Sequence, residues 1–462
     1  MMRRQFLGGL AAAAVACSGR RSVAQESVAV SLDIHEREAG YEIPGDFIGL
    51  SYETAQVANP DFFSPADKQL ADLFRELTST GVLRLGGGSS EFTAYDPVGD
   101  QLPRPFEVFG PDTSRTVKHG TVNSPLALKN LRGFLDATGW KLIWGLNLGQ
   151  GTLENAVREA AAVDEIVGSR LIAFQIGNEP DSFRNRYRPA NYAPEDFMKE
   201  WNSFHAAILA KIPQAKFAGP DISNKVPYFT AFASEAPQHK DVILLTAHSY
   251  AMGPAGSPTS TIDSLLDGNP KLETQPDDKL DVILAAARNV GLSYRMSEGN
   301  SCWDGGKAGV SDTLASALWC IDYMLNLAQR GVSGVNFHGG GNGFYTPIAG
   351  APSTGFMKRP EYFGIQFMRP LLGSRFLQTT PTGAGTRVSA YALRSANRDR
   401  LVIINKEDSP IVIKTSVTPK TSAMLLTGAA LDSKGPIVVK EIPVARENTL
   451  MVPTHSAVSY RL

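Results

Sequence analysis

Short apolar runs alternate with amphipathic stretches from about residue 46 to residue 372. In the amphipathic stretches, apolar residues recur every three or four positions, which is the spacing of one face of an α-helix. This alternation is typical of strand–helix units around a parallel sheet. The predicted strands lie at residues 47–53, 82–85, 142–146, 172–176, 216–219, 242–246, 294–297 and 334–337. Eight is the strand number of a (β/α)8 or TIM barrel, and the sequence therefore predicts an α/β barrel domain over residues 46–375.

Several of the predicted helices have recognisable ends. Ser64 and Ser124 each precede a proline, and the apolar stripes that follow them end at Gly81 and Gly139. Serine before proline favours a helix start, and glycine favours a helix end. Ser311 precedes a longer apolar stripe. We expect each stripe to pack against the outside of the barrel.

The pattern changes after residue 372 to alternating apolar and polar positions without helical stretches. Strands are predicted at 387–393, 401–404, 411–413, 423–426, 437–439 and 457–462, which together indicate a C-terminal β-sandwich over residues 376–462. A further strand lies within residues 25–45. We expect this N-terminal strand to pair with the sandwich.

The first 24 residues resemble an export signal. Arg3 and Arg4 precede an apolar stretch, and small residues suited to cleavage follow near residue 24. The adjacent arginines resemble a twin-arginine signal, although an ordinary secretory signal is an open alternative. We expect export to the periplasm or the extracellular space. Cys17 follows Ala14-Val15-Ala16 and offers a second alternative, in which the protein is anchored by a lipid at this cysteine.

Composition narrows the classes of function. The 45 basic and 46 acidic residues give a net charge of −1, which becomes −5 once residues 1–24 and their four arginines are removed. A mildly acidic protein lacks the basic character that nucleic-acid binding requires. Three cysteines are too few for a disulfide framework, and the histidines show no metal-binding spacing. We expect no transmembrane span, metal or cofactor, and a monomer.

Two carboxylates are predicted to face one cleft. Glu179 follows the fourth strand and Glu298 follows the seventh. The loops after barrel strands converge at one end of the barrel, where catalytic groups gather. Cleavage of a glycosidic bond needs one carboxylic acid to protonate the leaving oxygen and one carboxylate to meet the developing charge at the anomeric carbon. The pair therefore predicts a glycosidase.

Three motifs carry a more specific resemblance. The sequence Asn178-Glu179-Pro180 after strand four, with Glu298 after strand seven, resembles the clan of retaining (β/α)8-barrel glycosidases. The segments 83–92, 297–301 and 337–345 are similar to glycoside hydrolase family 79, which contains β-glucuronidases and heparanases. The likeness covers nearly the whole chain without residues 1–24. It implies a retaining exo-β-glucuronidase in which Glu179 is the general acid/base and Glu298 the nucleophile.

The same resemblance suggests substrate-binding residues. Asn178 would hydrogen-bond the sugar 2-hydroxyl, and Tyr250 would hydrogen-bond the nucleophile, with a turn asparagine and a packing tyrosine as the respective alternatives. Glu53, after the first strand, would hold ring hydroxyls or cap a loop.

Recognition of a uronate carboxylate would fall to Trp303, Gly305 and Tyr345. Gly305 and Tyr345 match the family pattern, whereas Trp303 replaces an expected tyrosine and Asp304 adds a negative charge. These departures leave open a retaining β-glycosidase for a neutral sugar, glucose or xylose. A non-catalytic carbohydrate-binding protein is the alternative from another class. In each case we expect a carbohydrate partner.

Overall fold

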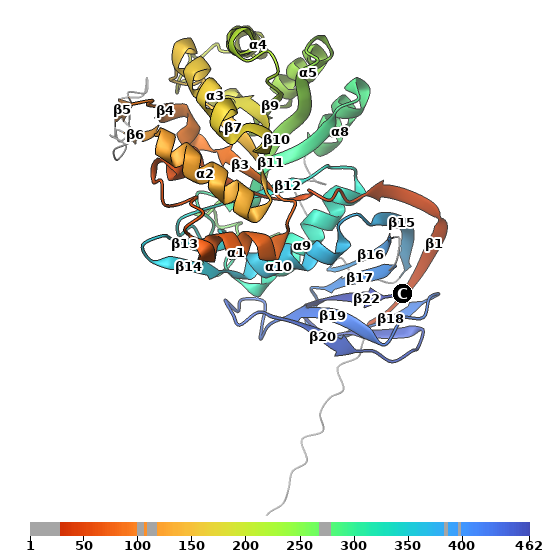
Figure 1. Cartoon of the computed structure of the whole chain (residues 1–462). Coiled ribbons are helices and arrows are strands. Elements are labelled where there is room, and N and C mark those ends of the chain that lie inside the picture. The colour runs from red at the N-terminus through yellow and green to blue at the C-terminus, as the bar shows by residue number, and fades with distance from the viewer. Residues whose placement is uncertain (1–27, 99–105, 109–117, 268–278, 383–386, 396–398) are drawn as a thin grey trace, which may run out of the picture.

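The computed structural model describes residues 28–98, 106–108, 118–267, 279–382, 387–395 and 399–462. The predicted signal peptide over residues 1–24, with Cys17, lies outside the described residues. The described chain forms a barrel of parallel strands surrounded by helices, and a mostly antiparallel sheet packed below it in Figure 1.

The predicted TIM barrel is confirmed. All eight predicted strands occur, and they close into a barrel in the neighbour order β10, β11, β12, β2, β3, β7, β8, β9. The pairings between neighbours are parallel. The strands are β2 (Ile48–Glu53), β3 (Val82–Gly86), β7 (Lys141–Leu146), β8 (Leu171–Ile176), β9 (Phe217–Ile222), β10 (Val242–Pro254), β11 (Ser293–Trp303) and β12 (Val335–Gly339).

Helices cover the outside of the barrel (Figure 1). They are α1 (Lys68–Leu77), α2 (Pro125–Thr138), α3 (Leu153–Val167), α4 (Pro194–Lys211), α5 (Val226–Glu235), α6 (Ile262–Leu266), α8 (Lys279–Val290), α9 (Leu314–Gln329) and α10 (Pro360–Met368). Short 3₁₀ turns lie at η1 (Thr54–Ala58), η2 (Gly88–Phe92), η3 (Gly168–Arg170), η4 (Pro180–Ser182), η5 (Ala236–Gln238) and η6 (Arg369–Leu371).

The helix starts follow local sequence, with one difference from prediction. Helix α2 begins as predicted, because the Ser124 hydroxyl accepts a hydrogen bond from the Ala127 N–H at 3.2 Å. Helix α1 begins after Asp67 instead of Ser64, since the Asp67 carboxylate takes the capping role. Helix α9 begins at Leu314, after Ser311, and the predicted apolar stripe is buried along it.

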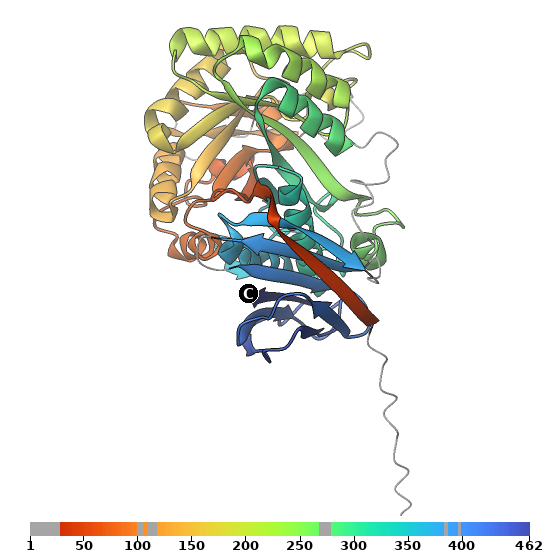
Figure 2. The ribbon, with the colours of Figure 1, turned by 90° about the vertical axis from the view of Figure 1, so that its right-hand side faces the viewer.

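The C-terminal region forms one curved nine-stranded sheet. Its order is β20, β19, β22, β17, β16, β15, β1, β18, β21, and β1 runs parallel to β18 and antiparallel to β15. Figure 2 shows β1 extending from the barrel into this sheet. The strands are β1 (Val28–Glu42), β15 (Arg375–Thr382), β16 (Val388–Arg394), β17 (Arg400–Asn405), β18 (Ile411–Thr415), β19 (Ser422–Thr427), β20 (Val438–Pro443), β21 (Thr449–Val452) and β22 (Ser456–Arg461).

The two faces of this sheet belong to different cores. Leu32, Leu401 and Ile413 are among the residues of a core enclosed by the curved sheet. Val402 and Ile404, on the opposite face, join the core of the barrel and its helices. Because successive strand residues point to opposite faces, one short strand such as β17 contributes to both cores.

A buried ion pair also joins the sheet to the barrel. The Lys406 ammonium lies 2.7 Å from a carboxylate oxygen of Asp322 in α9, and the lysine side chain is 3% exposed. Ser389 and Tyr391 donate hydrogen bonds to the same carboxylate at 2.9 and 2.6 Å. One carboxylate on a barrel helix thus accepts from two residues of β16 and from Lys406, which directly follows β17.

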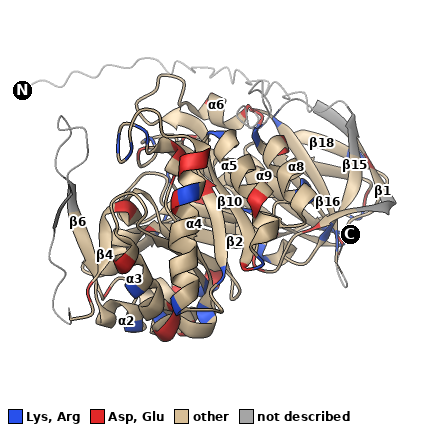
Figure 3. Ribbon diagram, turned by 90° about the horizontal axis from the view of Figure 1, so that it is seen from above, with Lys and Arg blue, Asp and Glu red and all other residues tan. Residues whose placement is uncertain are grey.

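Small elements complete the described chain. The hairpin β13 (Ile348–Ala351) and β14 (Gly355–Lys358) follows the last barrel strand, and β4 (Thr93–Tyr95), β5 (Phe106–Val108) and β6 (Lys118–Asn123) form a separate small sheet. Among the described residues, no helix combines the length and apolar character needed to cross a bilayer. Acidic and basic residues both occur on the barrel helices seen from above in Figure 3.

Candidate active site

A cavity of about 580 Å³ lies at the carboxyl ends of the barrel strands. It is lined by residues from the ends of β2, β8, β9, β10, β11 and β12, with Lys279 from the start of α8. All predicted site residues except Asn178 line it: Glu53, Glu179, Tyr250, Glu298, Trp303, Gly305 and Tyr345. Glu53, Tyr250, Glu298 and Trp303 lie within the barrel strands, and Glu179, Gly305 and Tyr345 lie on the loops that follow strands, so strands and loops together bring these residues to one end of the barrel.

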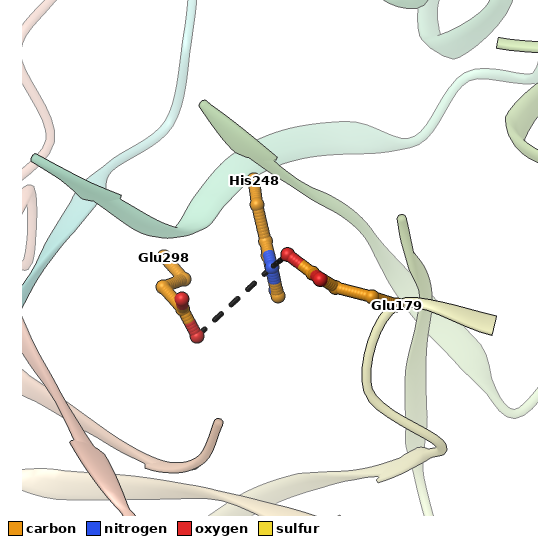
Figure 4. A group of neighbouring side chains, drawn as sticks. All are labelled: Glu179, His248 and Glu298. Carbon is orange, nitrogen blue, oxygen red and sulfur yellow. Dashed lines mark hydrogen bonds and ion pairs between the residues drawn. The ribbon is translucent and has the colours of Figure 1, made fainter. Parts of the chain in front are cut away.

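The carboxylates of Glu179 and Glu298 face each other across the cavity. An oxygen of Glu179 lies within 4.8 Å of an oxygen of Glu298, and the His248 ring stands between the two in Figure 4. Glu179 has a backbone φ of 53°, a left-handed conformation that is rare for a side-chain-bearing residue. Its N–H donates to the Asp221 carbonyl at 2.9 Å, which helps to hold this strained position.

Arg84, buried in β3, connects strand β11, which carries Glu298, with the loop that carries Glu179. It donates to the carboxylate of Glu298 and to the side-chain oxygen of Asn178, each at 2.8 Å, and it pairs with Asp221. Burial lowers the pKa of Arg84, but the charges of Asp221 and Glu298 outweigh burial and raise it. A permanent cation is thus fixed beneath the nucleophile position.

Glu298 lies among hydrogen-bond donors and positive charges. The Tyr250 hydroxyl donates to it at 2.8 Å, and a ring nitrogen of His338 lies 3.7 Å away. Burial would raise the pKa of Glu298, but the charges of His338, His248 and Arg84 reverse that effect and hold the pKa well below its usual range. Glu298 is therefore a carboxylate at neutral pH, as a nucleophile must be.

His248 bridges two carboxylates. Its Nδ1 lies 3.0 Å from Glu179, and its Nε2 lies 3.1 Å from Asp221. Burial lowers the pKa of His248, yet the charges of Asp221 and Glu298 overcome burial and raise the pKa to about 10. The ring is therefore an imidazolium at neutral pH.

Glu179, His248 and Glu298 also have the spacing of a metal-binding group within the described residues. In the structure, the two ring nitrogens of His248 contact Glu179 and Asp221.

Glu53 and His338 form another charged pair at the cavity floor. A ring nitrogen of His338 lies 3.6 Å from Glu53, and the Ser89 N–H donates to Glu53 at 2.7 Å. Burial raises the pKa of Glu53, but the hydrogen bond and charge of His338 outweigh it, so the pKa is lowered. Gly87, with φ +72°, leaves room for this carboxylate, since a Cβ there would lie 2.5 Å from it.

The predicted uronate-binding residues form one wall. The Tyr345 ring centroid lies 6.2 Å from that of Tyr250, and the Tyr345 N–H donates to the Gly305 carbonyl at 3.4 Å. Trp303 is 44% exposed at the rim, and Asp304 beside it has a φ of 64°. Both residues that depart from the family pattern therefore lie on the cavity surface.

Asn178 occupies a different place from the other predicted site residues. It is buried, and its side-chain oxygen accepts from Arg84 while its backbone N–H donates to Glu91. Its predicted contact with a sugar hydroxyl stays a prediction.

Sequence reasoning missed four charged groups at or beneath the cavity floor: Arg84, Asp221, His248 and His338. Arg84 was the clearest signal, because a charged residue inside an apolar strand must be paired when it is buried. His248 and His338 each follow an apolar strand core, as Glu179 does. Asp221 gave no comparable signal, since its strand was predicted to end two residues earlier.

Comparison of the sequence with known proteins identifies distant relatives. No family model matches the chain. A β-glucuronidase of Aspergillus niger is 24% identical over 437 residues, which cover 86% of this chain and 77% of the relative. A β-glucuronidase of Neurospora crassa is 25% identical over 436 residues, with 83% and 74% covered. The chain is a glycoside hydrolase, distantly homologous to these β-glucuronidases.

Solved structures support the fold of this glycoside hydrolase. A 4-O-α-L-rhamnosyl-β-D-glucuronidase from Fusarium oxysporum superposes with a TM-score of 0.74 and 17% identity, covering 94% of this chain and all of the other. A family 51 arabinofuranosidase from Xanthomonas axonopodis gives 0.68 and 13%, covering 94% and 99%. The relationship to β-glucuronidases expected from the motifs is confirmed.

Proposed function

We propose that this glycoside hydrolase is a retaining exo-β-glucuronidase. The observation that carries the proposal is the separation of Glu179 and Glu298, whose nearest oxygens lie within 4.8 Å. Retaining glycosidases place their two carboxyl groups about 5–5.5 Å apart, whereas inverting enzymes need about 6.5–9.5 Å to admit a water molecule. The short separation favours retention.

In the first step, a carboxylate oxygen of Glu298 forms a bond to the anomeric carbon. The bond from that carbon to the leaving-group oxygen breaks, and this oxygen takes a proton from Glu179. The Tyr250 hydroxyl and the Arg84 guanidinium hold Glu298 in place for attack. The product is a glycosyl ester on Glu298 and a free alcohol.

In the second step, Glu179 removes a proton from water, whose oxygen bonds to the anomeric carbon. The ester bond to Glu298 breaks, and its electron pair returns to the carboxylate. Arg84 and His248 lie against the oxygens where this charge reappears. Arg84 and His248 are thus in place during both half-reactions, and charges that are already in position stabilise the changing charge on Glu298 without rearrangement.

The size and charge of the cavity support a single terminal uronate as the substrate. A volume of about 580 Å³ suits a small ligand better than an extended polymer. Burial lowers the pKa of His338, but the charge of Glu298 and the contact with Glu53 outweigh burial and raise it. When His338 is protonated, its charge offsets part of the repulsion of these glutamates toward a sugar carboxylate. The Tyr345 hydroxyl and backbone of Gly305 would donate to that carboxylate.

A second candidate is a retaining β-glycosidase for a neutral sugar. The observation that favours it is Asp304, which lines the cavity on the wall assigned to the uronate carboxylate. A negative charge there disfavours an anionic sugar more than a neutral one.

Matched 4-nitrophenyl β-D-glucuronide, β-D-glucoside and β-D-xyloside test the proposal. The purified protein without residues 1–24 should prefer the glucuronide in kcat/KM by at least about 100-fold, because a site built for the carboxylate rejects sugars without it. Proton NMR of the first product formed should show the β-anomer. Glu298→Gln should lose activity by about a thousandfold or more, whereas Glu195→Gln, an exposed change on α4, should not.

Each other outcome identifies a different function. Preference for a neutral glycoside would replace the proposal with the second candidate. A first-formed α-anomer would overturn retention. Binding without turnover of any glycoside, by a protein with a normal unfolding transition, would favour a non-catalytic carbohydrate-binding protein.

A further inference from the structure

The cavity has two walls that belong to opposite arcs of the barrel. Glu298, His338 and Glu53 lie on β11, β12 and β2, which are neighbours in the barrel. Glu179 follows β8, and Ser223 follows β9, on the other arc. A retaining glycosidase holds its sugar over the nucleophile and its leaving group beside the acid/base. The second arc is therefore the leaving-group side.

On that side, four polar residues form a ledge next to Glu179: Ser182, Ser223, Asn224 and Lys279. The hydroxyls of Ser182 and Ser223 lie 3.1 Å apart, and the Ser182 N–H donates to the Glu179 carbonyl at 2.8 Å. The Lys279 ammonium donates to the carbonyls of Ser223 and His248. None of the four carries an aromatic ring or a large apolar group.

The ledge is fixed by one buried carboxylate. Asp181, two residues after Glu179, accepts hydrogen bonds from the backbone N–H groups of Ser223, Asn224 and Lys225 at 2.9–3.0 Å. It also accepts from the Ser223 hydroxyl at 2.9 Å. The acid/base loop and the turn after β9 are thereby held as one unit, although 42 residues separate Asp181 from Ser223 in sequence. Hydrogen-bonding groups held this rigidly lose little entropy when they bind a ligand.

We infer that this ledge is a leaving-group subsite that selects a hydroxylated leaving group, a second sugar, over an aromatic or apolar one. The inference rests on the proposed function and adds the specificity-determining residues Ser182 and Asn224. A sugar presents hydroxyls that can exchange hydrogen bonds with the serine hydroxyls, the Asn224 amide and the Lys279 ammonium. An apolar group would cover these groups without replacing the water bonded to them, which costs free energy.

Two kinds of β-glucuronide distinguish selection of the leaving group by the ledge from an effect on the catalytic steps. Glucuronosyl-glucose disaccharides with β-1,3, β-1,4 and β-1,6 linkages present a hydroxylated leaving group. Benzyl β-glucuronide presents an apolar alcohol that also needs protonation by Glu179. The measured quantity is the ratio of kcat/KM for the best disaccharide to kcat/KM for the benzyl compound.

In the Ser182→Ala/Asn224→Ala double variant, this ratio should fall about tenfold, because two hydrogen bonds of modest strength are lost. Ser234→Ala, which removes an exposed hydroxyl on α5 away from the cavity, should leave the ratio unchanged. The midpoint of thermal unfolding of each variant checks that the fold is intact.

The outcomes separate the two proposals. If the wild-type protein hydrolyses β-glucuronides but the double variant keeps the wild-type ratio, the ledge is not the specificity determinant and the glucuronidase proposal stands. A wild-type preference for the benzyl compound would also overturn the ledge. Turnover of no glucuronide of either kind would overturn the proposed function, and with it this inference.

Discussion

The hydroxyl of Tyr250 is a direct test of how Glu298 is kept charged. Tyr250→Phe removes the 2.8 Å hydrogen bond that stabilises the carboxylate, so the pKa of Glu298 should rise. We expect kcat/KM to fall about 10- to 100-fold, because the nucleophile loses a hydrogen bond that positions it for attack. The acidic limb of the pH profile of kcat/KM should move to higher pH, because the nucleophile now protonates sooner.

Tyr460→Phe is the matched control for this change. It removes a 2.9 Å hydrogen bond to the Met451 carbonyl in the C-terminal sheet, remote from the cavity. Its pH profile should coincide with that of the wild type. An acidic limb that stays in place in Tyr250→Phe would show that the histidines and Arg84 alone set the charge of Glu298.

His248 should contribute stability that depends on pH. Its pKa is about 10 in the folded protein against an ordinary value of 6.5, so its contribution is fully present below pH 6.5 and is lost as the pH rises toward 10. We expect His248→Gln to lower the free energy of unfolding by about 2–3 kcal/mol at pH 6, since it removes one of the two cations that contact the buried Asp221. Urea unfolding of both proteins at several pH values should show the difference shrinking toward pH 10.

His239 provides a control, because its pKa is shifted in the opposite direction from that of His248. Burial and the neighbouring His205 lower the pKa of His239, so it is neutral throughout the range above 6.5. The effect of His239→Gln should therefore stay constant from about pH 7.5 to 10, where His239 is neutral in both the folded and the unfolded protein. A His248→Gln effect that is equally constant would mean that His248 is neutral in the folded protein.

The candidate site could be predicted from sequence only where a residue carries its own signal. Glu179, Tyr250 and Glu298 each follow a predicted apolar strand, and the two glutamates stand within recognisable motifs, although β10 and β11 extend past Tyr250 and Glu298 in the structure. Asp221 and Lys279 were missed because their meaning depends on neighbours that are distant in sequence. The pairing of Asp221 with Arg84 and His248 exists only once three barrel strands meet.

At the scale of elements, periodicity predicted the barrel almost completely. Its strands are buried on both faces, so each appears as a continuous apolar run. Strands β15 and β21 were missed, because β15 contains Gln378 and several threonines and β21 is only four residues long. Helix starts were displaced where two capping residues compete, as Ser64 and Asp67 do before α1.

The C-terminal sheet shows a limit that periodicity cannot overcome. Alternation identifies strands, but the partner of each strand depends on contacts across the whole chain. The parallel pairing of β1 with β18 joins residues nearly 400 positions apart, Val28 with Ile411. No local pattern contains that information.

At the scale of the whole molecule, the barrel and the sheet are expected to unfold as one unit. The barrel core includes Tyr391, Val402 and Ile404 from the sheet, so neither unit can lose its structure without exposing apolar surface of the other. All five tryptophans precede residue 372, and tryptophan fluorescence therefore reports the barrel. Far-ultraviolet circular dichroism reports both units. The two signals should give coincident denaturation curves.

The Asp322–Lys406 pair is the polar part of the contact between the sheet and the barrel. Asp322→Ala should lower the free energy of unfolding by about 3–5 kcal/mol, because it leaves the buried Lys406 ammonium without its partner. The double variant Asp322→Ala/Lys406→Met should recover at least about half of that loss, since the unpaired charge is gone.

Asp399→Ala, which breaks a more exposed pair with Arg394, should cost only about 0–1 kcal/mol. If Asp322→Ala cost no more than Asp399→Ala, or if the two spectroscopic transitions separated in the wild type, the sheet would be an appended unit and not a structural part of the barrel.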